Sequence, residues 1–367
     1  MRHAVRTASA ASAATTPADK LSRHEKPDSV MPRIAVDAMG GDHAPAATIA
    51  GALLALSDST VDVQIQLVGQ ESVILSELAK QGGVPEANAA RLEIVPATQV
   101  IEMNDKPSAA VRGKRDSSMV IGLKLQADGK SDAFVSAGNT GAQMAASTIV
   151  LRLHEGLTRP AIATLFPTDR GAPIVLLDAG ANVDCSPLEL LQFARLGAVY
   201  AEDILGRPRP AIGLLSIGEE PEKGSLAVKE AHPLLLASGL NFVGNVEGGD
   251  LPHGATARGP LDVVVCDGFA GNTVLKFYEA VAPMIFGLLL KHGAPKSAVD
   301  AVAHMFDYAQ YGGAPLLGVR GVSIICHGKS LPEAIKNAIQ VAALAVQHGM
   351  SAHIGRSLRA TPVEGTQ

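Results

Sequence analysis

Aromatic residues are scarce in this sequence: Phe and Tyr make up 3% of its 367 residues, and tryptophan is absent. Proteins that bind single-stranded nucleic acid use aromatic side chains as stacking platforms, so this scarcity argues against that mode of binding. Positive charge is not in excess either, because 31 Lys and Arg face 36 Asp and Glu, a formal net charge of −5. We therefore expect no nucleic-acid partner.

Cysteine is rarer than Phe and Tyr together, with three residues in the sequence. Cys185, Cys266 and Cys326 have no paired spacing, so they indicate neither a disulfide framework nor a zinc site. Cys266 and Cys326 lie in apolar, strand-like segments, where a buried and reduced thiol is the expected state. Reduced thiols fit a cytoplasmic protein. We predict no metal and no cofactor.

A long apolar run and a secretory signal are missing as well. The stretch 280–290 is the longest apolar candidate, and it falls short of the roughly 18 residues that a membrane-spanning helix needs. Residues 1–30 are rich in Ala, Ser and Thr and lack the apolar centre of a signal peptide, so we predict a disordered tail. Residues 31–352 are predicted to form an α/β domain, with a possible subdomain at about 160–330, and 353–367 a C-terminal tail.

What the sequence does contain is an alternation of short β-branched segments with helical patterns such as 186–205. Several strand segments are apolar throughout, as expected for strands covered on both faces. This alternation predicts a doubly wound α/β fold around a mostly parallel sheet. The predicted strands are 33–38, 63–69, 91–96, 132–138, 173–180, 211–218, 241–246, 262–268 and 321–328.

Polar residues and glycines follow nearly every predicted strand. In doubly wound sheets, ligands bind where the carboxyl ends of the strands lead into helices, so these residues predict a polar site on one rim. They are Asp37, Gly40, Gly41, Asp42 and His43; Ser136, Gly138, Asn139, Thr140 and Gly141; Asp178, Asn182 and Asp184; Glu220, Lys223 and Asn245; and Asp267, Gly271, Asn272, Thr273 and Lys276.

Two of these loops are candidates for phosphate binding. In SAGNTG (136–141), Asn139 or Thr140 would begin a helix whose free N–H groups favour an anion. A plain tight turn with a capping residue is the alternative. The segment CDGFAGNTVLK (266–276) repeats the arrangement, with Gly271, Asn272 and Thr273 in the loop and Lys276 one turn inside its helix.

Signatures of other chemistries are missing. The sequence has no GxxxxGK[ST] loop and no dinucleotide turn. It also has no GxSxG elbow, and its cysteines lie in strand segments, so a covalent nucleophile is unsupported. His43 and His327 are possible acid–base groups, although each alone is more often structural. A polar cradle without a nucleophile suits direct attack by phosphate on an activated acyl group.

Basic residues are concentrated in the segment 102–119, which contains Lys106, Arg112, Lys114 and Arg115. Three interpretations stay open at this point. The segment is a solvated helix face, or Arg112 binds phosphate, or the cluster is a docking surface for an acidic partner.

Taken in order, nine motifs resemble the bacterial phosphate acyltransferase family of phospholipid synthesis, with a close match from about Arg33 to Ser330. The motifs are AVDAMGGDHAP (35–45), EMNDKPSAAVRGKRDSSM (102–119), SAGNTGA (136–142), RPAIATLFPT (159–168), LLDAGANVDCSP (176–187), GLLSIGEEPEKGS (213–225), NFVGNVEGGDL (241–251), DVVVCDGFAGNTVLK (262–276) and YGGAPLLG (311–318).

The resemblance implies a three-layer α/β fold like that of isocitrate and isopropylmalate dehydrogenases, and kinship with phosphotransacetylases. It implies a homodimer that moves a fatty acyl group from acyl carrier protein to inorganic phosphate. A membrane glycerol-3-phosphate acyltransferase would then use the acyl phosphate for phospholipid synthesis. On the matched motifs we assign catalytic roles to His43, Asn182, Asp184 and Lys276. We assign carrier docking to Lys106, Arg112, Lys114 and Arg115.

Two departures from the family pattern concern the tail before Met31, which has no counterpart, and the segment from Lys276 to Tyr311. We predict that this segment is shorter than the long protruding helical hairpin of some relatives. The helix expected at 272–291 is apolar almost all round, so it meets either a membrane surface or a dimer partner. Competing functions are a phosphotransacetylase that uses coenzyme A, a dehydrogenase of similar fold, and a non-catalytic lipid or metabolite sensor.

Overall fold

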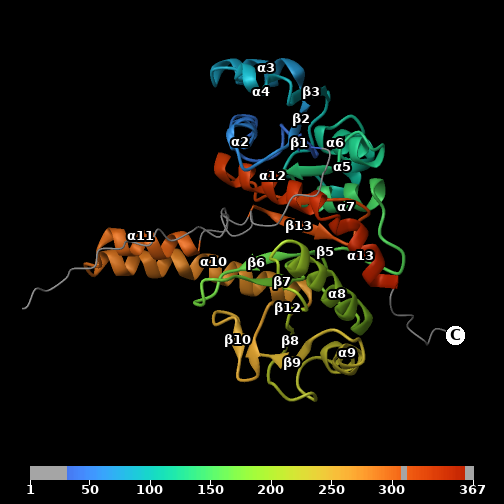
Figure 1. Ribbon diagram of the computed structural model, residues 1–367, viewed down its shortest axis with the longest axis vertical. Coiled ribbons are helices and arrows are strands. Elements are labelled where there is room, and N and C mark those ends of the chain that lie inside the picture. The colour runs from blue at the N-terminus through green and yellow to red at the C-terminus, as the bar shows by residue number, and fades with distance from the viewer. Residues whose placement is uncertain (1–30, 307–311, 360–367) are drawn as a thin grey trace, which may run out of the picture.

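The computed structural model describes residues 31–306 and 312–359. Its strands form two main sheets, which follow one another along the long axis of the molecule in Figure 1. The tail predicted for residues 1–30 lies outside the described residues.

The first sheet has seven strands. Five adjacent strands run parallel to one another, while β13 is antiparallel to the strands on both of its sides. The order across the sheet is β3 (Leu92–Pro96), β2 (Gln64–Gly69), β1 (Arg33–Asp37), β4 (Ala133–Ser136), β14 (Ser323–Ile325), β13 (Ala314–Leu317) and β5 (Ala161–Ile162).

The second sheet has five strands, of which only β6 is antiparallel to its neighbour. The order is β6 (Thr164–Phe166), β7 (Ile174–Leu177), β12 (Val263–Val265), β8 (Ile212–Leu215) and β9 (Phe242–Val246). A small separate hairpin consists of β10 (Ala255–Thr256) and β11 (Gly259–Pro260).

All nine strands predicted from the sequence are present, and the doubly wound, mostly parallel fold is confirmed. The prediction of one rim was wrong, because the strand ends belong to two sheets. The chain leaves the first sheet after Ile162 and enters the second at Thr164. The strands that sequence reasoning missed, among them β5, β6 and β13, have two to four residues, which is too short for a periodic pattern to show.

Helices cover both faces of the first sheet. Ile34 and Val36 of β1 lie in one buried cluster with residues of α2 and α12, whereas Ala35 lies in a second cluster with residues of α6 and α7. Successive residues of a strand point to opposite faces, so these helices form the outer layers of a three-layer sandwich. The described helices are α2 (Ala46–Ser57), α3 (Glu71–Lys80), α4 (Glu86–Ala89), α5 (Pro107–Gly113), α6 (Ser118–Ala127), α7 (Thr140–Val150), α8 (Pro187–Asp203), α9 (Leu226–Leu236), α10 (Gly268–Lys291), α11 (Lys296–Met305), α12 (Pro332–Gln347) and α13 (Met350–Arg359).

Helix α8 is the central helix of the second half and confirms the helical pattern at 186–205. It begins with a capping box, in which Ser186 accepts from the N–H of Glu189 and the Glu189 carboxylate accepts from the N–H of Ser186. Gly197 allows α8 to approach the sheet closely, because a Cβ at this position would lie 2.6 Å from Val263 and 2.8 Å from Leu177.

Helices α10 and α11 form a hairpin that projects from the body of the molecule (Figure 1). The first helix begins at Gly268 and continues without a break through Pro283 to Lys291. That this segment is shorter than the hairpin of some relatives stays a prediction. Among the described residues, α10 is the one helix that is long and apolar enough to cross a membrane by length and composition, which the stretch 280–290 alone did not indicate.

The C-terminal tail predicted from residue 353 is not a tail over its first part. Residues Met350–Arg359 form α13, which buries Met350 and Ile354 and packs against α8. His353 contributes a polar contact to α8, with its Nδ1 3.0 Å from Asp203 Oδ1. A helical pattern was present in the sequence, because the apolar residues Met350, Ile354 and Leu358 recur at every fourth position.

Candidate functional site

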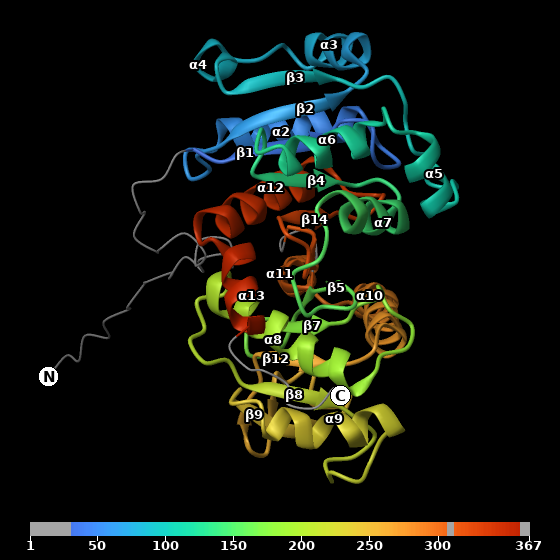
Figure 2. The ribbon, with the colours of Figure 1, turned by 90° about the vertical axis from the view of Figure 1, so that its right-hand side faces the viewer.

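The loops that follow β4, β7, β8 and β12 lie on the same side of the molecule, on the right in Figure 2. The two sheets thus present their carboxyl ends to a common side, although they are separate sheets. A shared buried cluster links them, because it contains Ala142 of α7 and Ala179 of the loop after β7, and Leu275 of α10 packs against it. The two loops proposed for phosphate binding are therefore neighbours in the fold.

The loop after β4 is built on a buried carboxylate. The Ser136 hydroxyl donates to Asp37 Oδ2 at 2.7 Å and accepts from the N–H of Gly138 at 3.0 Å. Burial raises the pKa of Asp37, and hydrogen bonds from serine hydroxyls and backbone N–H groups oppose that shift. Gly40 is required at this contact, since a Cβ there would lie 2.6 Å from Asp37 Oδ2 and 2.8 Å from the Gly138 nitrogen.

Helix α7 starts at the end of this loop, as predicted. Its first two N–H groups, those of Thr140 and Gly141, have no acceptor among the described residues. The next N–H, that of Ala142, donates to the Asn139 side chain. Two free donors at a helix N-terminus form a ready anion-binding position.

The Asn139 side chain itself is fully occupied by protein contacts. Its Oδ1 caps α7, and its Nδ2 lies 3.0–3.3 Å from the carbonyl oxygens of Glu102, Met103 and Asp105. Asn139 therefore ties the basic segment to the phosphate loop. The Asn139 side chain therefore positions the loop, and the N–H groups of Thr140 and Gly141 are the candidate anion donors.

The loop after β1 meets the loop after β14. The N–H of Asp42 donates to the carbonyl of Gly328 at 2.7 Å, and a Cβ on Gly41 would lie 3.2 Å from the same oxygen. His43 is exposed beside this contact. The His327 Nδ1 accepts from the N–H of Lys329 at 3.1 Å, so the two candidate histidines lie on adjoining loops.

In the second sheet, the loop after β7 wraps around Asp178. The buried carboxylate accepts from the N–H groups of Ile162, Gly180, Ala181 and Asn182 and from Asn182 Nδ2, at 2.6–3.2 Å. Burial raises the pKa of Asp178, and these donors act against that shift. Asp178 is thus an organising group of the loop, with both carboxylate oxygens occupied.

The beginning of α10 is held against this loop. The N–H of Gly268 donates to the carbonyl of Asn182 at 2.7 Å, and a Cβ on Gly271 would lie 2.0 Å from the Asp178 carbonyl oxygen. Asp267 caps the helix by accepting from the N–H of Ala270 at 2.7 Å. Glycine is needed at both positions because only a residue without a Cβ permits this approach.

A second free helix N-terminus at Gly271, Asn272 and Thr273 was a wrong prediction. The helix begins at Gly268, so the N–H groups of these three residues lie inside helical turns and are bonded there. Asn272 and Thr273 are exposed on the surface of α10. Lys276 is also exposed, and its Nζ is 2.7 Å from Glu279 of the same helix, so the structure shows an intrahelical ion pair at this residue.

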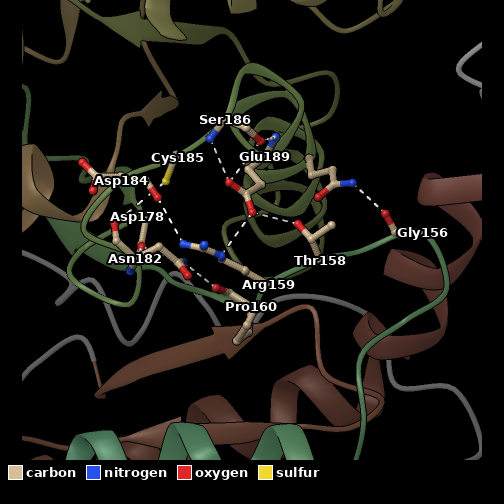
Figure 3. Close-up of polar contacts among 11 residues, drawn as sticks. Gly156, Thr158, Arg159, Pro160, Asp178, Asn182, Asp184, Cys185, Ser186 and Glu189 are labelled. Atoms are coloured by element: carbon tan, nitrogen blue, oxygen red, sulfur yellow. Dashed lines mark hydrogen bonds and ion pairs between the residues drawn. The ribbon is translucent and has the colours of Figure 1, made fainter. Parts of the chain in front are cut away.

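Two residues near this loop escaped sequence reasoning, Arg159 and Glu189, and Figure 3 shows their contacts. The Glu189 carboxylate accepts from Thr158 at 2.9 Å and pairs with Arg159 Nε at 3.3 Å. Arg159 NH1 reaches the carbonyl of Asp184 at 3.2 Å, and Asn182 Nδ2 donates to the carbonyl of Pro160 at 2.8 Å (Figure 3).

This network clamps the segment before β5 to the loop after β7. Burial opposes ionisation of Glu189, but hydrogen bonds from Ser186 and Thr158 outweigh it and lower its pKa. Asp184 stays exposed, whereas the Asn182 side chain is buried and bonded to Asp178 and Pro160. The sequence carried no local signal for this pair, because Arg159 and Glu189 are distant along the chain.

The loops after β8 and β9 border a cavity of about 520 Å³ that is open to solvent and lined by Gly218, Glu219, Glu220, Pro221, Glu247 and Arg258. Asn245 holds one wall, because its buried amide donates to the carbonyl of Glu220 at 2.8 Å and its oxygen contacts His232 at 3.0 Å. Lys223 packs beside Gly218. The cavity therefore extends the polar carboxyl edge of the second sheet.

The basic segment is only partly a free cationic surface. Lys114 is occupied, since its Nζ lies 2.5 Å from Asp105 and 2.8 Å from the carbonyl of Val100. Lys106, Arg112 and Arg115 are exposed, and no carboxylate pairs with them among the described residues. Helix α5, which carries Arg112, packs against α7, so this surface adjoins the phosphate loop.

The cysteines are confirmed as free thiols and do not have the properties of nucleophiles. Cys266 and Cys326 are buried directly after β12 and β14, rather than inside the strands. Burial raises the pKa of the half-buried Cys185 to about 12. A thiol with so high a pKa is protonated at neutral pH and reacts slowly.

Comparison with known proteins adds the following. A family described as "Fatty acid synthesis protein" matches residues 32–353. The chain is 49% identical to a phosphate acyltransferase of Desulfitobacterium hafniense, over 89% of this chain and 97% of the relative. It is 46% identical to a phosphate acyltransferase of Pelotomaculum thermopropionicum, over 91% of this chain and 97% of the relative.

Among solved structures, the chain resembles the EutD phosphotransacetylase of Staphylococcus aureus. The TM-score is 0.60 at 17% identity, covering 90% of this chain and 97% of the other. A phosphotransacetylase of Streptococcus pyogenes gives a TM-score of 0.59 at 17% identity, covering 86% and 94%. At such identities the likeness concerns the fold alone, and it agrees with the predicted α/β architecture.

Proposed function

The chain belongs to the phosphate acyltransferase family, and on that premise we propose that it transfers a fatty acyl group from acyl-acyl carrier protein to inorganic phosphate. As a member of this family it is a transferase. The observation that carries the proposal is the N-terminus of α7, where the N–H groups of Thr140 and Gly141 have no acceptor in the part of the chain that the structure describes and adjoin a buried frame. A phosphate bound there has the second sheet's loops beside it.

The reaction requires no covalent enzyme intermediate. An oxygen of phosphate attacks the thioester carbonyl carbon and forms a new C–O bond, while the carbonyl electrons move to its oxygen. The tetrahedral intermediate collapses, the C–S bond breaks, and the carrier's thiolate leaves and takes up a proton. The protein contributes orientation and N–H donors for the developing negative charge.

Charge supports a carrier protein as the donor. Acyl carrier protein is acidic, and the exposed cations Lys106, Arg112 and Arg115 lie on the segment that Asn139 ties to the phosphate loop. Complementary charge accelerates encounter and sets orientation. A carrier docked on this surface would deliver its acyl group at the start of α7.

A rate comparison tests this function. We expect purified protein to form acyl phosphate and free carrier from acyl-acyl carrier protein, only when inorganic phosphate is present. With acyl-coenzyme A as donor, the rate should be lower at equal concentration. A preference for short acyl-coenzyme A would establish a phosphotransacetylase instead, and absence of turnover with every donor would point to a sensor.

We further propose a cytoplasmic homodimer whose product passes to a membrane glycerol-3-phosphate acyltransferase. The α10–α11 hairpin supports membrane contact without crossing, because it projects from the body (Figure 1) and carries exposed apolar side chains. Beyond the first turn of α10, its exposed large apolar residues are Phe277, Met284, Ile285, Leu288, Leu289, Leu290 and Val302. Such a surface suits either the interfacial region of a bilayer or a second copy of the chain.

Liposome sedimentation separates these roles. Wild type should pellet with anionic liposomes, whereas the Ile285→Glu, Leu289→Glu double variant should stay in the supernatant while dimeric and active. Leu75→Glu is the matched control, since Leu75 is comparably exposed on α3. If the hairpin variant becomes monomeric or insoluble, the hairpin belongs to the dimer interface.

A further inference from the structure

Highly exposed apolar side chains follow three neighbouring strands of the second sheet. Val183, in the loop after β7, is 67% exposed; Phe269, in the first turn of α10 after β12, is 68% exposed; and Ile217, in the loop after β8, is 80% exposed. Because β7, β12 and β8 are adjacent in the sheet, the segments that follow them form one edge. Adjacent strands lie about 4.8 Å apart, so the strand ends beneath these loops span about 10 Å.

Each of these side chains adjoins the frame of the candidate site. Val183 follows Asn182, whose carbonyl accepts from the N–H of Gly268, and Phe269 follows Gly268 directly. Ile217 precedes Gly218, which lines the 520 Å³ cavity. The apolar edge therefore runs from the loop around Asp178 to the mouth of that cavity.

The first sheet carries a corresponding pair on the same side. Met103, whose carbonyl is held by Asn139, is 47% exposed, and Leu331 after β14 is 62% exposed. Exposed apolar side chains scattered singly are ordinary on protein surfaces. Here they recur at the carboxyl ends of strands, where ligands bind in this fold, so this apolar surface indicates a binding site.

Charge on the same loops restricts what that occupant can be. Carboxylates flank the apolar edge at Asp184, Asp267, Glu219 and Glu220. Only Glu219 has a cationic partner among the described residues, Arg258 at 3.1 Å, while Lys223 lies beside Gly218. An anionic membrane surface or an acidic protein would be repelled by this border, whereas an uncharged hydrocarbon chain would not.

We infer that Val183, Phe269 and Ile217 bind the hydrocarbon chain of the acyl donor, and so set the preference for long over short chains. This rests on the proposed acyl transfer and assigns it a chain-binding surface. The reacting carbonyl lies toward the start of α7, and the chain extends across the ends of β7, β12 and β8. Each methylene buried on this edge adds binding, about fourfold per CH₂ when burial is complete.

The test measures kcat/KM with carrier-free acyl thioesters whose chains range from about four to about sixteen carbons. Along this series, the change in kcat/KM per added CH₂ reports how much of the chain is buried. We expect wild type to prefer long chains. The Ile217→Ser, Phe269→Ser double variant should lower the ratio of long-chain to short-chain kcat/KM about tenfold or more, with the short-chain rate retained. Leu236→Ser is the matched control, because Leu236 is 64% exposed at the far end of α9.

Three results would overturn the inference. One is a double variant whose chain-length profile matches that of wild type. Another is conversion of a wild-type dimer to a monomer, which would make this edge an interface between copies. A third is an equal loss at all chain lengths, which would place these residues in the catalytic frame. If wild type itself forms no acyl phosphate, the proposed function fails as well, so the two failures are distinguishable.

Discussion

Replacing Asn139 with alanine should destabilise the protein and misplace its phosphate loop. The substitution removes the cap of α7, worth about 1 kcal/mol. It also removes the donor that Glu102, Met103 and Asp105 share, and unpaired, partly buried carbonyls cost about 1–2 kcal/mol more. We therefore expect a loss of about 2–3 kcal/mol in the free energy of unfolding.

For a domain of this size each kcal/mol lowers Tm by about 2 °C, so Asn139→Ala should melt about 4–6 °C below wild type. The KM for phosphate should rise, because the N–H groups of Thr140 and Gly141 lose their support. Asn139→Ser is the informative control. Serine retains the cap but is too short to reach the three carbonyls, so its Tm should fall between those of wild type and Asn139→Ala.

Calorimetry and steady-state kinetics on the same preparations decide the matter. A variant that melts with wild type would refute the positioning role that the contacts indicate. A variant of normal Tm whose KM for phosphate rises about tenfold would show that the amide contacts the ligand directly, since a lost polar contact to a charged ligand costs about 1.5–3 kcal/mol. That outcome would restore the role predicted from the sequence alone.

Three further predictions concern the exposed cations of the basic segment, the Glu189 carboxylate and the Cys185 thiol. The double variant Lys106→Glu, Arg115→Glu should raise the KM for acyl-acyl carrier protein several-fold at low salt and flatten the salt dependence of that KM. Its kinetics with carrier-free thioesters should not change. Lys130→Glu, just before the amino end of β4, is the control. The folded-state pKa of Glu189 lies below its usual 4.5, so its ionised form stabilises the fold above that pH and the contribution is lost as pH falls through the folded pKa. Glu189→Gln should thus be less stable than wild type in urea at pH 7 and approach it in acid, and parallel curves at all pH values would exclude this linkage. Alkylation of native Cys185 should be slow at pH 8 and still rising at pH 10, because its pKa is raised to about 12; a plateau near pH 8.5 would contradict that.

The fold class was accessible from the sequence because its signals are local. Strands such as 33–38 and 262–268 are short β-branched runs. The start of α8 is indicated by Ser186, Pro187 and Glu189, which form its capping sequence. The start of α7 at Thr140 was predicted for the same reason, since a capping asparagine after glycine is read from neighbouring residues. Each of these features depends on contacts between residues only a few positions apart.

What the tertiary structure decided depends on distant residues. Asn139 meets carbonyls more than thirty positions away, Glu189 meets Thr158 and Arg159, and Lys114 is taken up by Asp105. Such pairings form because the fold brings distant segments of the chain together, and no local sequence pattern predicts them. The division into two sheets likewise turns on the two-residue strand β5, whose place is fixed by its partner β13.

The apparent phosphate loop at Gly271 illustrates the same limit. By itself the sequence determined that glycines, a cap and a helix occur between 266 and 291. It could not determine that Gly268 and Gly271 serve to admit the Asp178–Asn182 loop, because a glycine that binds a ligand and one that admits a neighbouring backbone leave the same mark in a sequence. Only the packing of α10 against that loop distinguishes the two.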